Sequence, residues 1–288
     1  MATLINHQAQ SPDCLPIARM CDSAQLDRRT YYRPAGRAEI GQDHIHLRDH
    51  IQRIALEWPS YGYRRITHEL ARQGILANNK LVPRLMREDN LLCLRKRHFV
   101  GTTDSRHTLP IYPNLAGQMT LTDIDELWIA DITYIRLLRE FIYLAVILDA
   151  FSRRCIGWAL ERHLQAELAI EALKMAVGAG GVKAGLVHHS DRGVQYASHE
   201  YTGLLEEHSI RISMSRRGNA YDNAKAERFM RTLKYEEVYM NEYEDMYEAR
   251  ERMGYFLEEV YNRKRLHSAL GYLPPAEFEQ SLLTANTP

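Results

Sequence analysis

Three apolar runs that follow one another closely constrain the fold of this chain more than any other feature of its sequence. LWIADITYI, FIYLAVILDAF and RRCIGWAL lie between residues 127 and 160. They are rich in β-branched and aromatic residues, and short polar breaks separate them, which predicts a three-stranded β-meander. Asp131 stands inside the first run. A carboxylate buried in a strand costs several kcal/mol unless something neutralises its charge.

The elements after the meander alternate between helix and strand. We expect helices over residues 164–177, 198–208 and 222–236, with strands at LVHHSD and IRISMS between them. The order β-β-β-α-β-α-β-α is that of the ribonuclease H-like fold, an α/β core with a five-stranded mixed sheet. A long amphipathic helix over residues 245–262 and a polar, proline-containing tail follow it.

The N-terminal third has helical periodicity instead. Apolar spacing predicts helices over residues 44–58, 63–72 and 80–89, with a shorter helical pair between residues 15 and 32. The last two of the three are joined by a turn that contains Gly74, and the final one has basic outward positions. This pattern predicts an all-α helix-turn-helix region, although a plain helical hairpin has the same pattern. Pro83 fits less well, because it removes an amide donor near the start of that final helix.

The chain therefore divides into five segments. These are a short helical N-terminal segment (1–40), a helix-turn-helix-like DNA-binding domain (41–98), a linker (99–121), a ribonuclease H-like catalytic core (122–240) and a C-terminal helix with its tail (241–288). The linker follows from a polar stretch that is broken by Pro110 and Pro113 and has no periodicity.

A net charge of zero conceals an asymmetry between the two ends of the chain. Residues 1–119 carry 17 basic and 11 acidic side chains, whereas residues 120–288 carry 20 and 26. Ten basic residues face four acidic ones between residues 51 and 100. A basic module joined to an acidic one is typical of an arm that grips a polyanion beside a domain that holds cations. The candidate DNA contacts in the basic module are Arg64, Arg65, Lys80, Arg84 and Arg87.

Composition argues against membrane, secreted and zinc-finger proteins. The longest apolar run, residues 141–148, is too short to cross a bilayer, and the first residues lack the basic and apolar regions of a signal peptide. Four cysteines without a CxxC pair argue against a disulfide framework or a zinc finger. We expect a bacterial, cytoplasmic protein that associates with the nucleoid when it is bound to DNA.

Three carboxylates form the candidate catalytic and metal site. Asp131 lies within the first strand, Asp191 follows the fourth strand in HHSDRG, and Glu227 lies on the helix of YDNAKAERFMRTLK. Their convergence from separate elements is best explained by divalent metal, and oxygen ligands favour Mg²⁺, with Mn²⁺ as a substitute. Two ions about 4 Å apart can activate an attacking oxygen and stabilise a leaving oxygen in phosphoryl transfer.

Each carboxylate also has an ordinary interpretation when it is taken alone. Asp131 could pair with an arginine, Asp191 could form a turn, and Glu227 could be a solvated helix residue. Asp149, at the end of the second strand, is the strongest rival ligand. Of the two histidines beside Asp191, His188 and His189, we expect one to pack inward and one to face the site.

The spacing of the three carboxylates and the motifs around them resemble those of a known protein family. Fifty-nine residues separate Asp131 from Asp191 and thirty-five separate Asp191 from Glu227. The matching stretches are YGYRRITHEL, LWIADITYI, LDAFSRRCIGWAL, HHSDRGVQY, SRRGNAYDNAKAERFMRTLK and YNRKRLHSALGYLPP. With this spacing the chain resembles DDE-type transposases and retroviral-type integrases, and more closely the second-frame (OrfB) product of the insertion sequence three family.

The resemblance implies a DNA transposase that uses Asp131, Asp191 and Glu227 as its triad. It implies that Lys234, seven residues after the glutamate, contacts DNA near the cut. Asn223 and Arg231 fall on the same helical face as Glu227 and Lys234, so we expect them at the DNA as well. The enzyme would bind terminal inverted repeats, nick a 3′ end and join it to another phosphodiester, in relatives through a circular intermediate.

The implied partners are terminal and target DNA, further copies of the chain on that DNA, and an upstream-frame protein or fusion with a helix-turn-helix and a leucine zipper. The chain itself has no heptad run long enough for such a zipper. Two other functions stay open: a structure-selective nuclease on the ribonuclease H-like fold, and a domesticated, non-catalytic DNA-binding protein. The intact triad argues against the second, and the flanking motifs argue against the first.

Overall fold

The computed structural model describes residues 17–23, 44–91, 109–180, 182–216 and 223–285. The chain separates into two compact units, residues 1–53 and 54–288. The first contains helix α2 (Ile17–Ser23) and the beginning of helix α4 (Ile45–Glu57). The second contains everything that follows, including the sheet. Of the helical pair that the sequence predicts between residues 15 and 32, only α2 lies within the described residues.

The core of the second unit is a five-stranded mixed sheet with the order β3-β2-β1-β4-β5. Strands β1 (Leu127–Arg136), β2 (Phe141–Asp149) and β3 (Cys155–Glu161) form the predicted antiparallel meander. Strands β4 (Val187–Ser190) and β5 (Arg211–Met214) extend the sheet in parallel. The predicted fold class, a ribonuclease H-like core with a five-stranded mixed sheet, is confirmed.

The register between β1 and β4 positions the candidate site. The two strands pair only from Leu127 to Ile129 on β1, although β1 continues for seven more residues. Asp131 therefore lies two residues beyond the last paired position, on a stretch of β1 whose other edge still pairs with β2. Asp191 lies one residue beyond the end of β4. Both aspartates thus follow the same short region of parallel pairing.

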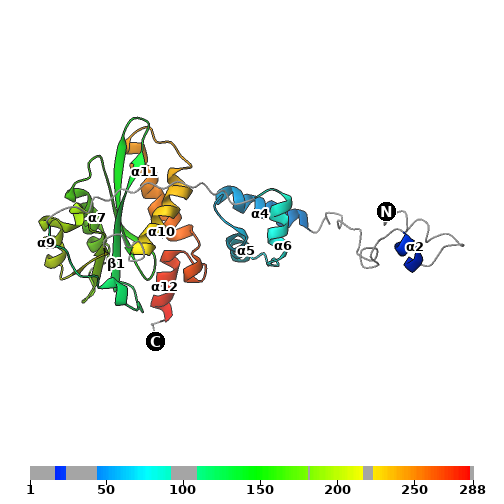
Figure 1. The fold of residues 1–288 in the computed structure, drawn as a ribbon, viewed down its shortest axis with the longest axis horizontal. Coiled ribbons are helices and arrows are strands. Elements are labelled where there is room, and N and C mark those ends of the chain that lie inside the picture. Colours follow the sequence, from blue (N-terminus) through cyan, green and yellow to red (C-terminus); the bar gives the residue numbers. More distant parts are fainter. Residues whose placement is uncertain (1–16, 24–43, 92–108, 181, 217–222, 286–288) are drawn as a thin grey trace. The chain divides into compact units, whose positions relative to one another are not determined.

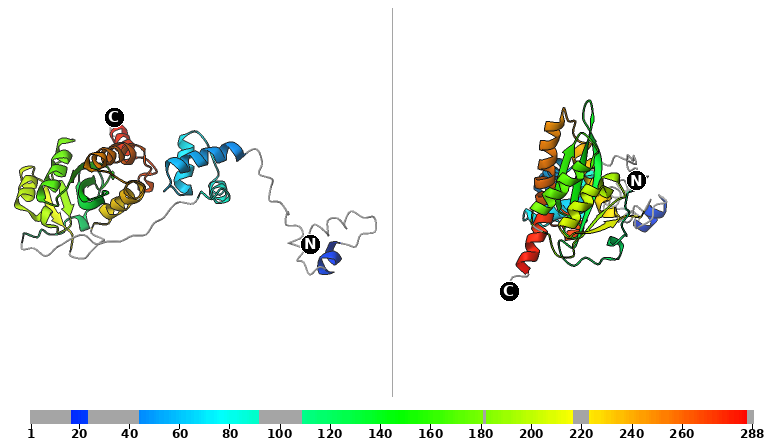
Figure 2. Two further views of the ribbon diagram at one scale, coloured as in Figure 1. Left: turned by 90° about the horizontal axis from the view of Figure 1, so that it is seen from above. Right: turned by 90° about the vertical axis from the view of Figure 1, so that its left-hand side faces the viewer.

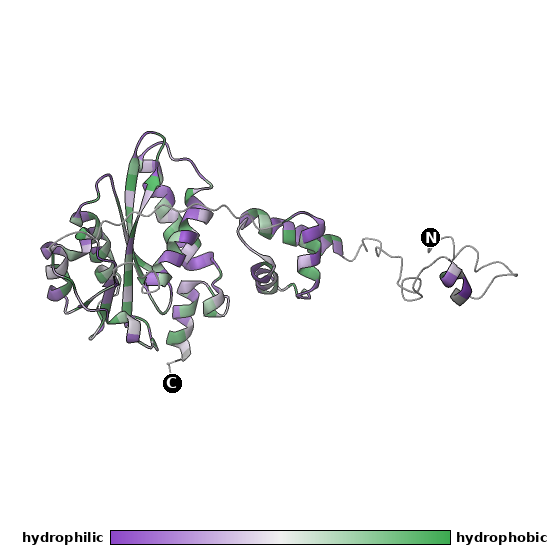
Figure 3. Ribbon diagram, viewed as in Figure 1, coloured by the Kyte–Doolittle hydropathy of each residue, from purple (hydrophilic) through white to green (hydrophobic). Residues whose placement is uncertain are grey.

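Helices cover both faces of the sheet. On one face, α7 (Ala166–Gly178), α8 (Val194–Ala197) and α9 (His199–Glu207) pack against the strands. On the other, the cover is α10 (Ala224–Leu233), α11 (Met246–Tyr255) and the π-helical segment η5 (Phe256–Lys264) that continues α11. Figure 1 shows α7 and α9 on one side of β1 and α10 and α11 on the other, and Figure 2 shows the same layers from above. The first four residues of β1 are therefore buried, and hydrophobic and hydrophilic segments alternate along its ribbon in Figure 3.

The segments around α10 and α11 extend further than the sequence predicts. A π-helical turn, η4 (Lys234–Val238), follows α10 directly, and a short 3₁₀ helix, η6 (Ser268–Leu270), follows η5. The C-terminal tail contains helix α12 (Pro275–Ala285), which the sequence analysis did not predict. Its start at Pro275 is physically reasonable, because proline is well tolerated at the first position of a helix.

The N-terminal helices are confirmed close to their predicted bounds. After α4 come α5 (Tyr63–Arg72), with Ile66 and Leu70 buried, and α6 (Leu81–Glu88), with Val82, Leu85 and Met86 buried. Pro83 is accommodated because it lies in the first turn of α6, where amides have no partner within the helix. Of the predicted linker, residues 99–108 lie outside the described part of the chain and residues 109–121 lie within it. Its described end contains the 3₁₀ helix η2 (Ala116–Gln118).

None of the helices in the described part of the chain is long and apolar enough to span a membrane.

Gly157 provides a test of the packing between β3 and α7. A methyl group at this position would overlap the carbonyl oxygen of Ala172 and the methyl group of Ala176. We expect Gly157→Ala to lower the free energy of unfolding by about 2–3 kcal/mol, as overpacking in a rigid core does. Urea denaturation of the purified variant measures this change.

Gly203, in the exposed middle of α9, is the matched control, because a methyl group there meets no atom within 4 Å. Gly203→Ala should leave stability unchanged or raise it by roughly 0.5–1 kcal/mol through its better helix propensity. Equal stabilities for the two variants would contradict the packing described for β3 and α7.

Candidate active site

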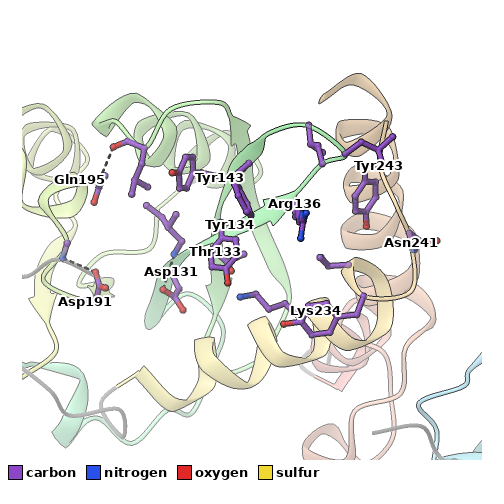
Figure 4. Close-up of a pocket in the computed structure, with 18 of the residues that line it drawn as sticks. Asp131, Thr133, Tyr134, Arg136, Tyr143, Asp191, Gln195, Lys234, Asn241 and Tyr243 are labelled. Atoms are coloured by element: carbon purple, nitrogen blue, oxygen red, sulfur yellow. Dashed lines mark hydrogen bonds between the residues drawn. The ribbon is translucent and has the colours of Figure 1, made fainter. Parts of the chain in front are cut away.

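Two of the predicted carboxylates, Asp131 and Asp191, line one cleft (Figure 4). The cleft has a volume of about 1040 Å³. Each aspartate side chain accepts a hydrogen bond from a nearby main-chain amide. Oδ1 of Asp131 accepts from the amide of Ile132, and Oδ1 of Asp191 accepts from the amide of Gly193, both at 2.9 Å. Both carboxylates are therefore oriented by the main chain and remain partly exposed to the cleft.

Glu227 approaches the same region from α10. Its helix is fixed by four side chains buried against the sheet, Ala226, Phe229, Met230 and Leu233, and Glu227 itself is exposed. Glu227 does not line the cleft, yet its negative charge acts on Asp131. The structure thus brings Asp131 and Asp191 together and places Glu227 within electrostatic reach of them.

The crowding of negative charge changes the acidity of Asp131. Burial, the charge of Asp191 and then that of Glu227 raise the pKa of Asp131 to about 7, while the Ile132 amide and Lys234 act in the opposite direction. Burial also lowers the pKa of Lys234, and the charge of Asp131 opposes this. Burial and the neighbouring carboxylates thus outweigh the favourable charge of Lys234, so ionised Asp131 is not fully compensated by the protein.

The described residues do not by themselves form a complete metal cage. Among them, no three histidine, cysteine or acidic side chains are grouped closely enough to hold an ion. Residues 217–222, which lead directly into α10, lie outside the described part of the chain. The chemistry of the donors nevertheless fits a hard divalent cation, because all three candidate ligands are carboxylates and their mutual repulsion is unbalanced.

Family models match most of the second unit and part of the N-terminal region. Models described as "Integrase core domain" match residues 123–220 and 208–275, and one described as "HTH-like domain" matches residues 42–99. The chain is 36% identical over 267 residues to an uncharacterized 31 kDa protein of insertion element IS600 from Shigella sonnei, covering 91% of this chain and 97% of the relative. It is 33% identical over 283 residues to the transposase InsF for insertion sequence IS3A from Escherichia coli (strain K12), covering 96% and 97% of the two chains.

The chain belongs to the IS3 family of transposases. It is accordingly an enzyme with a DDE-type integrase core, preceded by a helix-turn-helix-like domain. Among solved structures, a simian T-cell lymphotropic virus intasome is similar with a TM-score of 0.47 and 18% identity, over 77% of this chain and 71% of that one.

The predicted DNA contacts on α10 of the transposase separate in the structure. Lys234 lines the cleft, and its Nζ lies 4.7 Å from the ring centroid of Tyr134 (Figure 4). Arg231 is exposed, as expected. Asn223 is not: only 8% of it is exposed, and its amide donates a hydrogen bond to the carbonyl of Ala130, 3.3 Å away. Helical spacing grouped Asn223 with the DNA-facing residues, but it precedes the helix and its amide group is directed at β1.

The predicted contacts in the helix-turn-helix-like domain also divide. Arg64, Lys80, Arg84 and Arg87 are exposed on or beside α5 and α6. Arg65 is partly buried over the ring of Tyr61, at 5.3 Å from its centroid, and burial lowers its pKa. Adjacent positions on a helix point in different directions, so Arg64 and Arg65 do not share one surface.

Asp149, the rival ligand, has a structural role. It is 1% exposed, and its carboxylate accepts hydrogen bonds from the amides of Asp125, Phe151 and Ser152. These bonds fix the turn between β2 and β3. A carboxylate that already accepts three main-chain amides in a buried turn is not positioned to hold an ion in the cleft.

The prediction that one of the two histidines faces the site is wrong, because both pack inward. His189 is fully buried between the hydroxyls of Ser213 and Ser215, at 2.8 and 3.0 Å, and His188 meets the hydroxyl of Tyr201 at 2.9 Å. Consecutive strand residues point to opposite faces, but here both faces of β4 are covered by protein. Burial lowers the pKa of His188 to about 3, so it is neutral at physiological pH.

The sequence analysis missed the aromatic part of the cleft and a tyrosine beside the carboxylates. Tyr134, Phe141, Tyr143 and Tyr239 line the cleft beyond Lys234. Tyr196 also lines it, and its buried hydroxyl has no hydrogen-bond partner among the described residues, while the charges of Asp131 and Asp191 act on it. The available signal was the position of Tyr196 in HHSDRGVQY, five residues after Asp191.

The raised pKa of Asp131 predicts how pH affects the metal-free transposase. The folded state retains a proton on Asp131 up to about pH 7, whereas an unfolded chain releases it near pH 4. Stability should therefore fall as pH rises from about 4 through 7, and the penalty is complete above pH 7. In EDTA at pH 8, Asp131→Asn should be more stable than the wild type by up to about 4 kcal/mol, the equivalent of a three-unit rise in pKa.

Thermal unfolding at several pH values measures this difference. Addition of Mg²⁺ at pH 8 should then stabilise the wild type and leave Asp131→Asn nearly unchanged. A wild-type protein whose metal-free stability is flat between pH 5 and 8 would contradict the electrostatic description of the site.

Proposed function

We propose that this transposase nicks the ends of an insertion sequence and joins the freed ends to DNA, with Asp131, Asp191 and Glu227 as its metal ligands. One observation supports the site above all others: Asp131 and Asp191 share a cleft, and the charge of Glu227 acts on Asp131. The family assignment supplies the reaction class, since the relatives at 33–36% identity include named transposases.

The carboxylates would hold Mg²⁺, with Mn²⁺ as a substitute, as a pair of ions. Carboxylate oxygens are preferred ligands of both cations, and no nitrogen or sulfur donor competes among the three residues. When bound, such a pair supplies activation of the attacking oxygen and stabilisation of the leaving oxygen. Other side chains of the protein would bind the DNA and orient it at the ions.

The reaction then has two balanced steps. In the first, water attacks a phosphodiester at the element's end, the P–O3′ bond breaks, and a 3′-hydroxyl is released. In the second, that hydroxyl attacks another phosphodiester, so one bond forms while one breaks. The number of phosphodiester bonds is conserved in the second step, and no nucleotide energy is required.

Lys234 and Arg231 are suited to hold the DNA strand beside the carboxylates. Lys234 lies in the cleft with Asp131 and Asp191, so its ammonium can neutralise a phosphate at the point where the strand enters. Arg231 is exposed one turn earlier on α10. In this proposal Asn223 orients β1 at Ala130, next to Asp131, and does not contact DNA directly.

The helix-turn-helix-like domain would bind the terminal inverted repeats. Its exposed cations, Arg64, Lys80, Arg84 and Arg87, are the proposed phosphate contacts, whereas Arg65 belongs to the packing around Tyr61. We further propose that several copies assemble on the two ends, with an upstream-frame protein or fusion as the additional partner, in the bacterial cytoplasm.

Substitution of the triad tests the proposed chemistry. Asp131→Asn, Asp191→Asn and Glu227→Gln should each lower nicking and joining by at least about a thousandfold, since removal of transition-state charge stabilisation alone costs roughly 10²–10³. DNA affinity should stay within a few-fold. The assay follows labelled end DNA with Mg²⁺ or Mn²⁺, and it scores 3′-hydroxyl joining separately from nicking. Nicking at the wild-type rate by any of the three variants would remove that residue from the triad, and nicking without joining by the wild type would identify a nuclease.

Lys234 tests whether α10 holds DNA or only carries Glu227. If Lys234 binds a phosphate, Lys234→Ala should weaken end binding and slow joining by about tenfold or more, and Lys234→Arg should restore part of both because the charge returns with altered geometry. The free energy of unfolding should change by less than about 0.5–1 kcal/mol. Arg263→Ala, which removes an exposed arginine paired with Glu259, is the control. Normal joining by Lys234→Ala at both low and physiological salt would assign α10 a purely structural role.

A further inference from the structure

Three cations gather on the side of the catalytic core where the β2–β3 turn meets α10. Arg153 lies in that turn, and Lys225 and Arg228 lie in the first turns of the helix. The charge of Arg153 acts on Lys225, and that of Arg228 acts on Arg153. Lys225 and Arg228 are three positions apart and share one helical face, which differs from the face of Glu227.

The local structure holds these cations in place. Nζ of Lys225 donates to the carbonyl of Ala150, 3.1 Å away. Arg153 has a left-handed backbone with φ 65°, and its amide donates to the carbonyl of Asp149. Because the Asp149 carboxylate is buried and accepts three other amides, the turn that carries Arg153 is tightly fixed.

A small depression opens between two of these side chains. It has a volume of about 310 Å³, and Arg153, Lys225, Ala150, Leu270 and Phe278 contribute to its lining. Arg153 and Lys225 are each partly buried, and Arg228 is exposed beside them. Arg153 and Lys225 therefore present positive charge to the depression from fixed positions.

The buried carboxylate of Asp149 attracts Arg153 and Lys225, but it forms an ion pair with neither of them. No carboxylate within the described chain forms an ion pair with Arg153, Lys225 or Arg228, although many other cations of the core have one. Burial and the neighbouring Arg228 hold the pKa of Arg153 below its usual value. Partly buried cations that repel one another are unfavourable in the free protein, and an anion would relieve that cost.

We propose that Arg153, Lys225 and Arg228 form a binding site for a phosphate of the DNA backbone, separate from the carboxylate cleft. DNA fits better than an acidic protein segment for two reasons. The depression is small, close to the lower end of ligand-site volumes, so it admits a phosphate and its sugar more readily than a helix. The same helix also carries Glu227 on another of its faces, so DNA in contact with the carboxylates would reach this site with a different phosphate.

The site would hold DNA that flanks the cleavage point, and in this respect the inference rests on the proposed function. Since phosphate contacts fix the register and orientation of DNA without reading its sequence, this site would act on any DNA in the active site. Its three residues are distinct from the DNA contacts that the sequence predicts, both in the basic N-terminal region and at Asn223, Arg231 and Lys234.

The salt dependence of DNA binding tests the site. Binding of the full chain to a labelled duplex of random sequence is measured between about 50 and 200 mM KCl. The variants are Lys225→Gln, Arg228→Gln and Arg153→Asn, the last chosen because asparagine tolerates a left-handed backbone. The double variant Arg153→Asn/Lys225→Gln should lower the log–log slope by roughly 0.9, the value of one phosphate contact, and Lys225→Arg should retain it.

Lys174→Gln is the control, because it removes an exposed cation on α7 that is paired with Glu171. It should leave the slope unchanged. If a substitution at Arg153 or Lys225 prevents folding, Arg228→Gln still decides the question, since Arg228 is exposed and supports no packing.

Unchanged slopes in Arg228→Gln and the double variant would overturn the inference. So would variants that keep the DNA slope but lose binding to polyglutamate, because that result assigns the depression to an acidic protein. Failure of the proposed function is distinguishable: the wild type would then fail to nick end DNA at any salt concentration, whatever the slopes of the variants.

Discussion

The short parallel pairing between β1 and β4 is the constraint on which the rest of this active site depends. It ends at Ile129, so β1 continues past β4 with one edge exposed and carries Asp131 beyond the paired region. Asp191 follows β4 immediately and meets the same cleft. Because Ile129 pairs with His189, Asp131 and Asp191 each lie two residues beyond the last paired position. The catalytic arrangement is therefore a consequence of strand length as much as of residue type.

The start of helix α10 is anchored to the sheet by two side chains, and this anchoring positions Glu227 near the other two carboxylates. Asn223 binds the carbonyl of Ala130, one residue before Asp131, and Lys225 binds the carbonyl of Ala150 just after β2. These two bonds attach the start of the helix to adjacent strands of the meander. Glu227, which follows directly, is held at a fixed height above β1 even though its own side chain is exposed. If Glu227 is a metal ligand, as proposed, its exposed side chain can adjust to the ion without moving the fold.

Much of this arrangement could be predicted from the sequence. The parts that could not be predicted have one physical cause in common. The strands, their succession along the chain and the spacing of the triad follow from local patterns, because apolar runs and polar breaks are visible in the sequence. Periodicity says which residues share a helical face, but it does not say which face meets the sheet. Asn223 was therefore grouped with DNA-facing residues although it binds β1, and His188 and His189 were divided between two environments although both faces of β4 are buried. The depression around Arg153 and Lys225 was equally unpredictable, because 72 positions of sequence separate its two cations.

The core keeps two unbalanced charge clusters on either side of one helix, and this links its stability to its ligands. Carboxylates repel one another around Asp131, and cations repel one another around Arg153. Each cluster costs stability in the free protein, so a ligand that neutralises it stabilises the folded state by mass action. Because α10 contributes Glu227 to one cluster and Lys225 to the other, a bound cation and a bound phosphate would lie near the same helix, where their opposite charges attract. Metal and DNA are then expected to bind with positive coupling across α10, and by linkage that coupling acts equally in both directions.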